Sequence, residues 1–492
     1  MDVIVAGAGP TGLMLAAELR LAGADVLVVD RLAAPTTESR AGGLHPRTME
    51  VLDQRGILGG FLAAGRRIQA AHFSGLRLDF TDLPTRYPFL LGLLQAETER
   101  LLADRAAELG VPVRRGAEVV GLRQDDGGVD AELADGSHLH AKYLVGCDGG
   151  RSTVRRLAGI DFPGTPATLT SLLGDVELAE PPDGQIFQRR RAGGDFSVLA
   201  FEPGWYRVMV TLPEPLDAAE EVTFERFRAA VTAVAGTDFG MHTPRWVSRF
   251  GDAARQTDRY RAGRVLLAGD AAHIHYPAGG QGLNTGVQDA VNLGWKLAAV
   301  VRGDQPDALL DTYEAERHPV AAQVLDNTRA QVALGRYDPQ TEALRAVVAG
   351  LLADPDANAR LAAMVSALDI AYDLGGGHPL VGRRLPDVDL ADGRRAYELL
   401  HDGRPVLLDL AADRERHLTA AAFPAEPTGR CLAYVPATCT ATSWRLPVLG
   451  TVATPTAVLV RPDGYVAWAA ADGGTAGLDR ALGTWCPVPA LA

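Results

Sequence analysis

The chain contains little cysteine, and its cysteines show no pairing pattern. Of 492 residues, four are cysteines, and none lies in a CxxC pair: Cys147, Cys431, Cys439 and Cys486. This usage fits a reducing compartment and excludes a disulfide-rich secreted fold or a cysteine zinc site. No apolar run reaches membrane-spanning length, and the apolar N-terminus carries Asp2 and Arg20 without the basic leading region of a signal peptide. We therefore expect a cytoplasmic protein without a membrane partner.

Positive charge is also scarce. The 48 Lys and Arg residues are outnumbered by 61 Asp and Glu residues, which gives a net charge of −13, and the single basic run is Arg189–Arg191. This balance argues against nucleic acid as a partner. The GxSxG, HExxH and P-loop patterns are missing, and no cluster has metal-ligand spacing. We therefore expect no metal, and we identify no catalytic side chain.

The N-terminal segment VIVAGAGPTGLMLAAELRLAGADVLVVD (3–30) carries a dinucleotide-binding pattern. Val3–Ala6 is predicted as a strand, Pro10 begins a helix, and Leu27–Val29 is the next strand. Gly7 permits the tight turn, Gly9 lets the backbone approach a pyrophosphate, and Gly12 lets the helix pack against the strand. Asp30 closes the second strand, where its carboxylate can accept from a ribose 2′-hydroxyl and would repel a 2′-phosphate. The tightly bound ligand is therefore FAD or NAD rather than NADP.

A second segment with a glycine-rich loop lies at 263–297. A plain NAD dehydrogenase does not require a second loop of this kind. The predicted strand Val265–Ala268 ends at Asp270, which can accept from a ribityl hydroxyl. The loop 277–282 has few side chains, so a flat ring can lie against its backbone. A helix predicted to start near Leu283-Asn284 would aim its positive dipole end at that ring. This arrangement suits a flavin, because reduced flavin carries negative charge.

The remaining sequence predicts further elements in a regular order. We expect a helix at 98–109, a hairpin around the Asp-Asp-Gly-Gly turn at 125–128 and a strand at 143–146. Residues from about 165 to 250 predict a separate sheet domain that includes a strand at 206–212. Helices are expected at 282–301 and 309–334. Beyond about 378, strands at 406–410 and 456–470 predict a small third domain.

Three motifs occur in the order of a known family: GAGPTG at 7–12, CDGGRSTVRR at 147–156 and GDAAHIHYPAGGQGLNTGVQDA at 269–290. The chain resembles the single-component FAD-dependent aromatic hydroxylases, and within them the actinobacterial aromatic-polyketide hydroxylases and rifampicin monooxygenases. The resemblance implies an α/β fold with a Rossmann-like FAD-binding domain of the glutathione-reductase type, a mixed-sheet substrate domain and a C-terminal thioredoxin-like domain. The implied boundaries are 1–165 and 255–375 for the FAD-binding domain, 166–254 with about 70–95 for the substrate domain, and 380–492 for the thioredoxin-like domain.

The resemblance also implies a set of cofactor-binding residues. Asp30 and Arg31 would hold the adenosine ribose, Arg40 and Gln95 would lie near the flavin or its linker, and Val119 would lie near adenine. The full implied set is Gly7, Gly9, Pro10, Thr11, Gly12, Asp30, Arg31, Arg40, Gln95, Val119, Asp148, Asp270, Pro277, Gly282, Leu283 and Asn284. Relatives of the rifampicin type have an arginine where Gly42 stands here, so any role of that arginine is absent or transferred.

The activity implied is hydroxylation of a polycyclic aromatic polyketide. NADPH or NADH, as a transient reductant, would reduce FAD, and a flavin C4a-hydroperoxide formed with O₂ would transfer one oxygen atom. Inactivation of a rifamycin-type antibiotic and Baeyer–Villiger oxidation on the same scaffold are alternatives. A non-enzymatic alternative is a flavin-loaded protein that binds aromatic drugs. A monomer or a homodimer is expected.

Two further sets of residues invite functional interpretations. His273 and His275 suggest a proton shuttle or metal pair, but we favour one histidine packed structurally and one in polar surroundings, because no third ligand has metal-site spacing. Four aromatic residues could line a flat-ring pocket, although core packing explains them about as well: Phe187, Phe196, Phe201 and Trp205.

Overall fold

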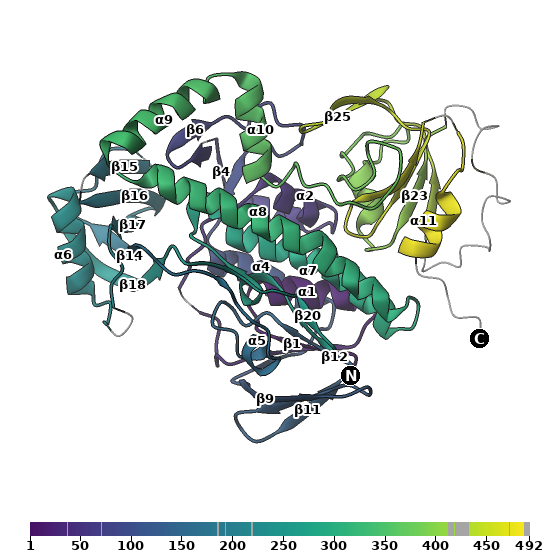
Figure 1. The fold of residues 1–492 in the computed structure, drawn as a ribbon, viewed down its shortest axis with the longest axis horizontal. Coiled ribbons are helices and arrows are strands. Elements are labelled where there is room, and N and C mark those ends of the chain that lie inside the picture. Colours follow the sequence, from purple (N-terminus) through teal and green to yellow (C-terminus); the bar gives the residue numbers. More distant parts are fainter. Residues whose placement is uncertain are drawn as a thin grey trace.

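A computed structural model describes residues 1–36, 38–69, 71–184, 186–191, 193–217, 220–411, 418, 432–471 and 473–486. Its elements form a parallel sheet with helices on it, an antiparallel sheet beside it and a smaller C-terminal domain (Figure 1). The mixed α/β fold, with a second sheet and a smaller C-terminal domain, agrees with the predicted fold class.

The central sheet has six strands in the order β20-β21-β12-β1-β2-β8. All neighbours pair in parallel except β20 and β21. The strands are β1 (Val3–Ala6), β2 (Val26–Asp30), β8 (Val113–Arg115), β12 (Tyr143–Gly146), β20 (Arg261–Ala262) and β21 (Val265–Leu267). Every residue of β1 and β12 is buried, as expected for parallel strands covered on both faces. The predicted strands at 3–6 and 143–146 are confirmed. Strand β21, which was predicted to end at Ala268, ends one residue earlier, at Leu267.

Four helices carry most of the helical layer: α1 (Pro10–Leu21), α4 (Gln95–Glu108), α7 (Gln281–Val301) and α8 (Asp311–Gly335). Figure 1 shows α8 running across the molecule in front of α7 and α1. Helix α4 begins three residues before the predicted Thr98. Helix α7 begins at Gln281, rather than at Leu283-Asn284, because a 3-10 turn over Ala278–Gly280 leads into it.

Smaller elements surround this layer. They comprise α2 (Pro46–Asp53), α3 (Leu58–Ala64), α5 (Thr153–Leu157), β3 (Gly43–Leu44), β4 (Arg66–Ile68), β5 (Ala71–Phe73), β6 (Leu76–Leu78), β7 (Leu90–Gly92), β9 (Val119–Gln124), β10 (Val129–Leu133), β11 (His138–Ala141), β13 (Gly164–Thr165), β19 (Ala254–Gln256), β22 (His273–Ile274), η1 (Gly269–Ala271), η2 (Ala278–Gly280) and η3 (Asp307–Leu310). The hairpin predicted around residues 125–128 is confirmed as β9 and β10.

The antiparallel sheet has the order β15-β16-β17-β14-β18. Its strands are β14 (Thr170–Leu178), β15 (Ile186–Arg191), β16 (Gly194–Glu202), β17 (Trp205–Leu212) and β18 (Met241–Gly251). Helix α6 (Phe224–Ala235) covers one face and forms a hydrophobic cluster with it. Figure 1 places α9 (Pro339–Leu352) above β15, and α10 (Pro355–Val365) beyond it.

The C-terminal domain contains the four-stranded mixed sheet β24-β23-β27-β28. Its elements are η4 (Ala396–Leu400), β23 (Val406–Asp409), β24 (Ala433–Pro436), β25 (Ser443–Leu446), β26 (Gly450–Ala453), β27 (Ala457–Val460), β28 (Val466–Ala470) and α11 (Leu478–Trp485). The hairpin predicted around Asp463-Gly464 is confirmed by the pairing of β27 with β28. Trp295 of α7 packs with Trp485 of α11, so this domain is joined to the central helices. Among helices of the described ranges, none is long and apolar enough to cross a membrane.

Candidate functional site

The three glycines of the first motif have the separate roles that their spacing predicts. Gly7 has a φ of 110°, and a Cβ there would lie 2.3 Å from the Cys147 carbonyl oxygen. A Cβ at Gly12 would lie 1.9 Å from the Gly7 carbonyl oxygen, so a side chain is excluded where α1 meets the turn. A Cβ at Gly9 would meet no described atom within 4 Å. The turn is therefore closely packed on one side and open at Gly9.

Asp30 ends β2 beside this turn. Its Oδ2 accepts a hydrogen bond of 2.7 Å from the backbone N–H of Ala8, and its Oδ1 accepts one of 2.8 Å from Leu32. The carboxylate therefore holds the glycine turn against the end of the sheet. Arg31 is exposed next to it, and Val119 is buried at the start of β9.

The first and third motifs meet at Thr11. A Cβ on Gly269 would lie 2.7 Å from Thr11 Oγ1, and one on Gly286 would lie 2.3 Å from it. Thus the start of α1, the turn after β21 and the second turn of α7 form one continuous surface. Asp270 is exposed at this surface, and its Oδ1 lies 3.9 Å from the position of a Cβ on Gly282.

The carboxylate of Asp148 is already used within the second motif. It accepts hydrogen bonds from the Ser152 hydroxyl and from the backbone N–H groups of Thr153, at 2.7 Å, and Val154, at 3.1 Å. Asp148 therefore fixes the start of α5. Any contact that it makes with a nucleotide is additional to this local role.

The loop before α7 depends on glycine backbone conformations. Gly279 and Gly280 have φ values of 70° and 69°, in the left-handed region where glycine avoids the strain of a Cβ. Asn284 fixes this loop, since its Nδ2 donates to the Gly280 carbonyl at 2.8 Å and to the Gly43 carbonyl at 3.2 Å. Pro277 precedes the turn, while Gly282 and Leu283 lie partly exposed in the first turn of α7.

Arg40 and Gln95 lie at the other side of the loop, near Gly42. Arg40 forms an exposed ion pair with Glu38 at 3.2 Å, and Gln95 accepts from the backbone N–H of Ala41 at 3.2 Å. A Cβ on Gly42 would lie 3.6 Å from Nη1 of Arg207. A guanidinium from β17 therefore lies in contact with position 42.

Arg207 was not singled out from the sequence. Its guanidinium pairs with the Asp175 carboxylate at 2.8 and 2.9 Å, and its exposed fraction is 7%. It lies between the rings of Phe201 and Trp246. The only sequence signal was an alternating strand pattern, which cannot show that an arginine faces the glycine pair at Gly42.

The two histidines of the third motif have mainly structural surroundings. His273 is fully buried, and its Nε2 lies 2.7 Å from Oδ2 of Asp289, whose Oδ1 accepts from Arg317 Nε at 2.7 Å. Burial alone would raise the pKa of Asp289, but Arg317 and His273 together lower it. His275 is hydrogen-bonded to the Tyr276 carbonyl at 2.8 Å, and burial lowers its pKa. The buried Asp289–Arg317 pair was not predicted.

A cavity of about 740 Å³ opens beside the glycine loop. It extends from Gly42–Gly43 and 277–280 to the face of the antiparallel sheet that is opposite α6. Strands β15, β16 and β17 contribute alternate residues to its wall, among them Gln188, Ser197, Leu199, Met209 and Thr211. Tyr276 closes one side, with its hydroxyl 3.0 Å from Ser171 Oγ and 3.3 Å from Thr211 Oγ1.

None of the four aromatic residues that could line a pocket lies among the residues that line this cavity, and core packing accounts for Phe187 and Phe196. Phe187 and Phe196 pack with Phe239 in the cluster under α6, on the other face of the sheet. Phe201 lies under Arg207, and Trp205 lies under Arg245. The period of two along β15 and β16 directs Phe187 and Phe196 away from the cavity, whose wall there is aliphatic and polar.

The residues present fit an FAD molecule. Gly9 leaves room for a pyrophosphate at the start of α1, Asp30 stands at the adjacent strand end, and Thr11 joins this turn to the Asp270 turn. The loop 277–280 then offers backbone, rather than side chains, to one edge of the large cavity. The adenine half and the flavin half of a dinucleotide site are therefore contiguous.

Comparison with known proteins agrees with this geometry. Residues 1–328 match the model of an FAD binding domain, and residues 378–489 match the model of an aromatic-ring hydroxylase C-terminal domain. The chain belongs to the FAD-dependent aromatic monooxygenase family. A rifampicin monooxygenase of Streptomyces venezuelae is 47% identical over 485 residues, covering 96% of each chain.

Two further relatives show how widely members of this family differ. The OxyS anhydrotetracycline hydroxylase structure from Streptomyces rimosus has a TM-score of 0.91 and 49% identity, over 99% of each chain. A dialkyldecalin synthase of Streptomyces rugosporus is 42% identical over 493 residues, covering 98% of each chain. The names of these three relatives describe a monooxygenase, a hydroxylase and a synthase, respectively.

Proposed function

We propose that this monooxygenase family member consumes NADPH or NADH and hydroxylates a polycyclic aromatic polyketide. The observation that carries the proposal is the 740 Å³ cavity, which begins at the glycine loop 277–280 and lies against the antiparallel sheet. Pockets for drug-sized ligands typically measure about 300–1,000 Å³. A flavin ring on this loop would fill one end of this volume, and the proposal assigns the part along β15, β16 and β17 to a molecule of several fused rings.

The proposal assigns the cofactor to the residues predicted from the sequence. Gly7, Gly9, Pro10, Thr11 and Gly12 would accommodate the pyrophosphate, with Asp30 at the ribose. Asp270 and the loop from Pro277 to Asn284 would hold the ribityl chain and the flavin ring. Bound FAD would supply the redox chemistry, taking a hydride from the nicotinamide and transferring oxygen from O₂ to an electron-rich ring.

The protein's own contribution is to orient the substrate and exclude water. The proposal divides the chain into an FAD-binding region (1–165 and 255–375), a substrate-binding sheet (166–254 with about 70–95) and an appendage (380–492). Aliphatic wall residues such as Leu199 and Met209 would cover the ring faces, and the Thr211–Tyr276 hydroxyls would meet polar ring substituents. Exclusion of water matters because it protects a reactive oxygenating species from collapse.

The test measures NADPH and NADH oxidation by the flavin-loaded protein, with and without trial substrates. A flavin-absorbance binding screen over anthracyclinones, angucyclines, tetracyclines and rifamycins selects those substrates. Substrate-stimulated oxidation and a product that gains one oxygen atom with its ring skeleton intact would support the proposal. A product with an expanded ring would indicate Baeyer–Villiger oxidation instead. A flavin that neither nucleotide reduces would refute oxygenation and would leave a binding protein or a non-oxidative catalyst.

A variant pair tests the location of the substrate. Met209→Trp fills the cavity wall, so stimulation by the substrate should be lost while FAD content is retained. Thr232→Trp places the same side chain on the exposed side of α6 and should behave as the unmodified protein does. Equal stimulation in both variants would contradict the assignment of the cavity to the substrate.

A further inference from the structure

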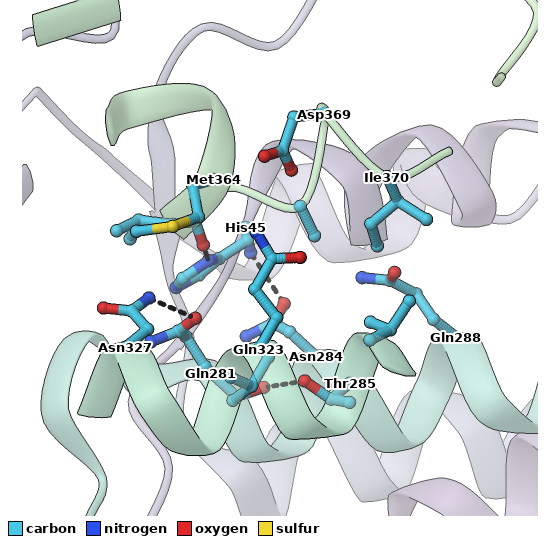
Figure 2. Close-up of a pocket in the computed structure, with 14 residues that line it drawn as sticks. His45, Gln281, Asn284, Thr285, Gln288, Gln323, Asn327, Met364, Asp369 and Ile370 are labelled. Carbon is cyan, nitrogen blue, oxygen red and sulfur yellow. Dashed lines mark hydrogen bonds between the residues drawn. The ribbon is translucent and has the colours of Figure 1, made fainter. Parts of the chain in front are cut away.

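His45 connects three separate segments next to the glycine loop. Its ring has an exposed fraction of 3%, and it lies between the large cavity and a second, small polar cavity. Nδ1 is 2.8 Å from the carbonyl oxygen of Val365, the last residue of α10, and Nε2 is 2.8 Å from the carbonyl oxygen of Gly279. Its backbone N–H donates to Asn284 Oδ1 at 2.8 Å. Figure 2 shows the ring among Met364, Asn284 and Gln281.

The protonation state of His45 decides how many of these contacts are hydrogen bonds. Both partners are carbonyl oxygens, which only accept, and a neutral imidazole has a single N–H. An imidazolium donates to Val365 and Gly279 together, whereas a neutral ring must leave one carbonyl facing a lone pair. The Val365 contact is buried and the Gly279 contact is partly buried. An unsatisfied carbonyl costs less where water reaches it, so the neutral ring keeps its proton for Val365 and releases Gly279.

Few charges compete with this equilibrium. Burial lowers the pKa of His45, and the two carbonyls oppose that shift. Asp369 is the one ionisable residue that lines the small cavity with it, because the described residues there from α7 and α8 are amides, Thr285 and two valines. On other neighbouring elements the ionisable groups are His72 on β5 and, on the helix that His45 caps, Arg47 and Glu50. The ionisable groups that line the rest of the large cavity are Arg190, Arg191, Asp195, Tyr276, Arg336, Tyr337 and Asp338.

Release of Gly279 matters because three described side chains hold the carbonyls of the loop 277–280, and one of them, Gln281, makes only a long contact of 3.3 Å with the Ala278 carbonyl. Asn284 fixes the carbonyl of Gly280, and His45 fixes that of Gly279 one residue earlier. Both glycines adopt left-handed conformations, so the chain there has access to more backbone states than any other residue type would permit. A freed Gly279 carbonyl leaves the described loop carbonyls held by side chains at Gly280 and, through a hydrogen bond of 3.3 Å from Gln281, at Ala278.

We propose that His45 is a positioning residue whose protonated ring clamps the Gly279 carbonyl, and thereby fixes the loop on which the flavin ring lies. The inference rests on the proposed function, because that function places flavin on this loop. FAD, which binds the ordered loop, then binds more tightly when His45 is protonated, and its binding in turn favours protonation.

Two substitutions separate the two contacts. The amide nitrogen of glutamine can replace Nε2, so His45→Gln retains the donor to Gly279 at every pH. The amide nitrogen of asparagine can replace Nδ1, so His45→Asn retains only the donor to Val365 and mimics the neutral ring. The dissociation constant for FAD, measured by quenching of flavin fluorescence, should be about tenfold higher for His45→Asn than for His45→Gln, the effect of one hydrogen bond. His138→Gln, an exposed exchange on β11, is the matched control and should leave this constant unchanged.

A pH series on the unsubstituted protein tests the same clamp without a substitution. Between pH 7.5 and 5.5 the affinity for FAD should rise up to about tenfold, and the amides of 279–283 should exchange hydrogen more slowly. The His45→Gln and His45→Asn proteins should show neither change, whereas Asp369→Asn should retain both. Equal FAD affinity in His45→Gln and His45→Asn, or a flat pH series, would overturn the inference. Failure of FAD to bind at all would refute the proposed function instead, and hydrogen exchange in the cofactor-free protein would still test the clamp.

Discussion

Replacement of Arg461 by methionine should destabilise the protein strongly, because the arginine links the C-terminal domain to the central helices. Arg461 lies between β27 and β28 and is fully buried. Its Nη1 and Nη2 donate to the two carboxylate oxygens of Glu316 on α8 at 2.8 and 2.7 Å, and it also pairs with Asp463. Lys296 of α7 lies 3.0 Å from the same glutamate. One buried cluster therefore joins two helices to the hairpin.

The magnitude follows from what the substitution leaves behind. Methionine retains volume but leaves Glu316 and Asp463 buried with Lys296 as the remaining cation. Removal of one partner from a buried ion pair typically costs about 3–5 kcal/mol of unfolding free energy. Glu316→Gln also removes one partner, so the two single variants and the double variant form a cycle. The double variant should lose less than the sum of the singles, by about 1–3 kcal/mol, since the residues are in contact.

Urea unfolding followed by tryptophan fluorescence measures this directly. Trp295 and Trp485 stack over the guanidinium at 5.5 and 4.6 Å, so their emission reports on the cluster. Arg100→Met removes an exposed arginine that pairs only along α4, and its unfolding midpoint should not change. A loss below about 1 kcal/mol in Arg461→Met, or strict additivity in the double variant, would refute the reasoning.

Three further outcomes are expected. Gly12→Ala should unfold the protein readily because its Cβ would collide with the Gly7 carbonyl, whereas Gly9→Ala should retain the thermal midpoint and lose FAD affinity, which flavin fluorescence checks. Burial raises the pKa of Asp369 to about 6, so the folded state binds the proton of this carboxyl more tightly than the unfolded chain does. The unfolding free energy should therefore fall by up to about 3 kcal/mol as the pH rises from about 4 to 6. Asp369→Asn should abolish this change. The pKa of Asp289 is lowered instead, so the stabilisation that this carboxylate contributes is lost as the pH falls. Asp289→Ala should lower the unfolding free energy in urea by about 3–5 kcal/mol, because it leaves the buried Arg317 without its carboxylate partner.

The cofactor motifs were predictable because they act through local backbone geometry. A glycine is required wherever a Cβ would collide with a neighbouring carbonyl, as at Gly7 and Gly12, and this requirement is visible in the sequence. Asp30 follows in the same way from its place at a strand end. By contrast, Asp148, which the resemblance includes in the cofactor-binding set, also fixes the start of α5, because a local hydrogen-bond pattern cannot be distinguished from a ligand site by residue type alone.

The substrate side was much less predictable. Phe187 and Phe196, two of the rings suggested for the pocket wall, lie in the cluster under α6, since a one-residue difference along a strand reverses the face on which a side chain lies. Arg207 reaches Gly42 across 165 residues of sequence, and His45 reaches Gly279 and Val365 across 234 and 320. These contacts depend on how sheets and helices pack, so no local sequence pattern predicts them.

The sequence by itself therefore determined the cofactor class, the order of the motifs and the positions of the main strands and helices, because each depends on steric rules or periodicities within a few residues. The tertiary structure alone decided which side chains line the cavity, which buried charges join the domains and which histidine contacts the loop 277–280. Those properties arise where segments distant in the chain come into contact, and the physical terms that govern them, burial and unsatisfied hydrogen bonds, exist only in the folded protein.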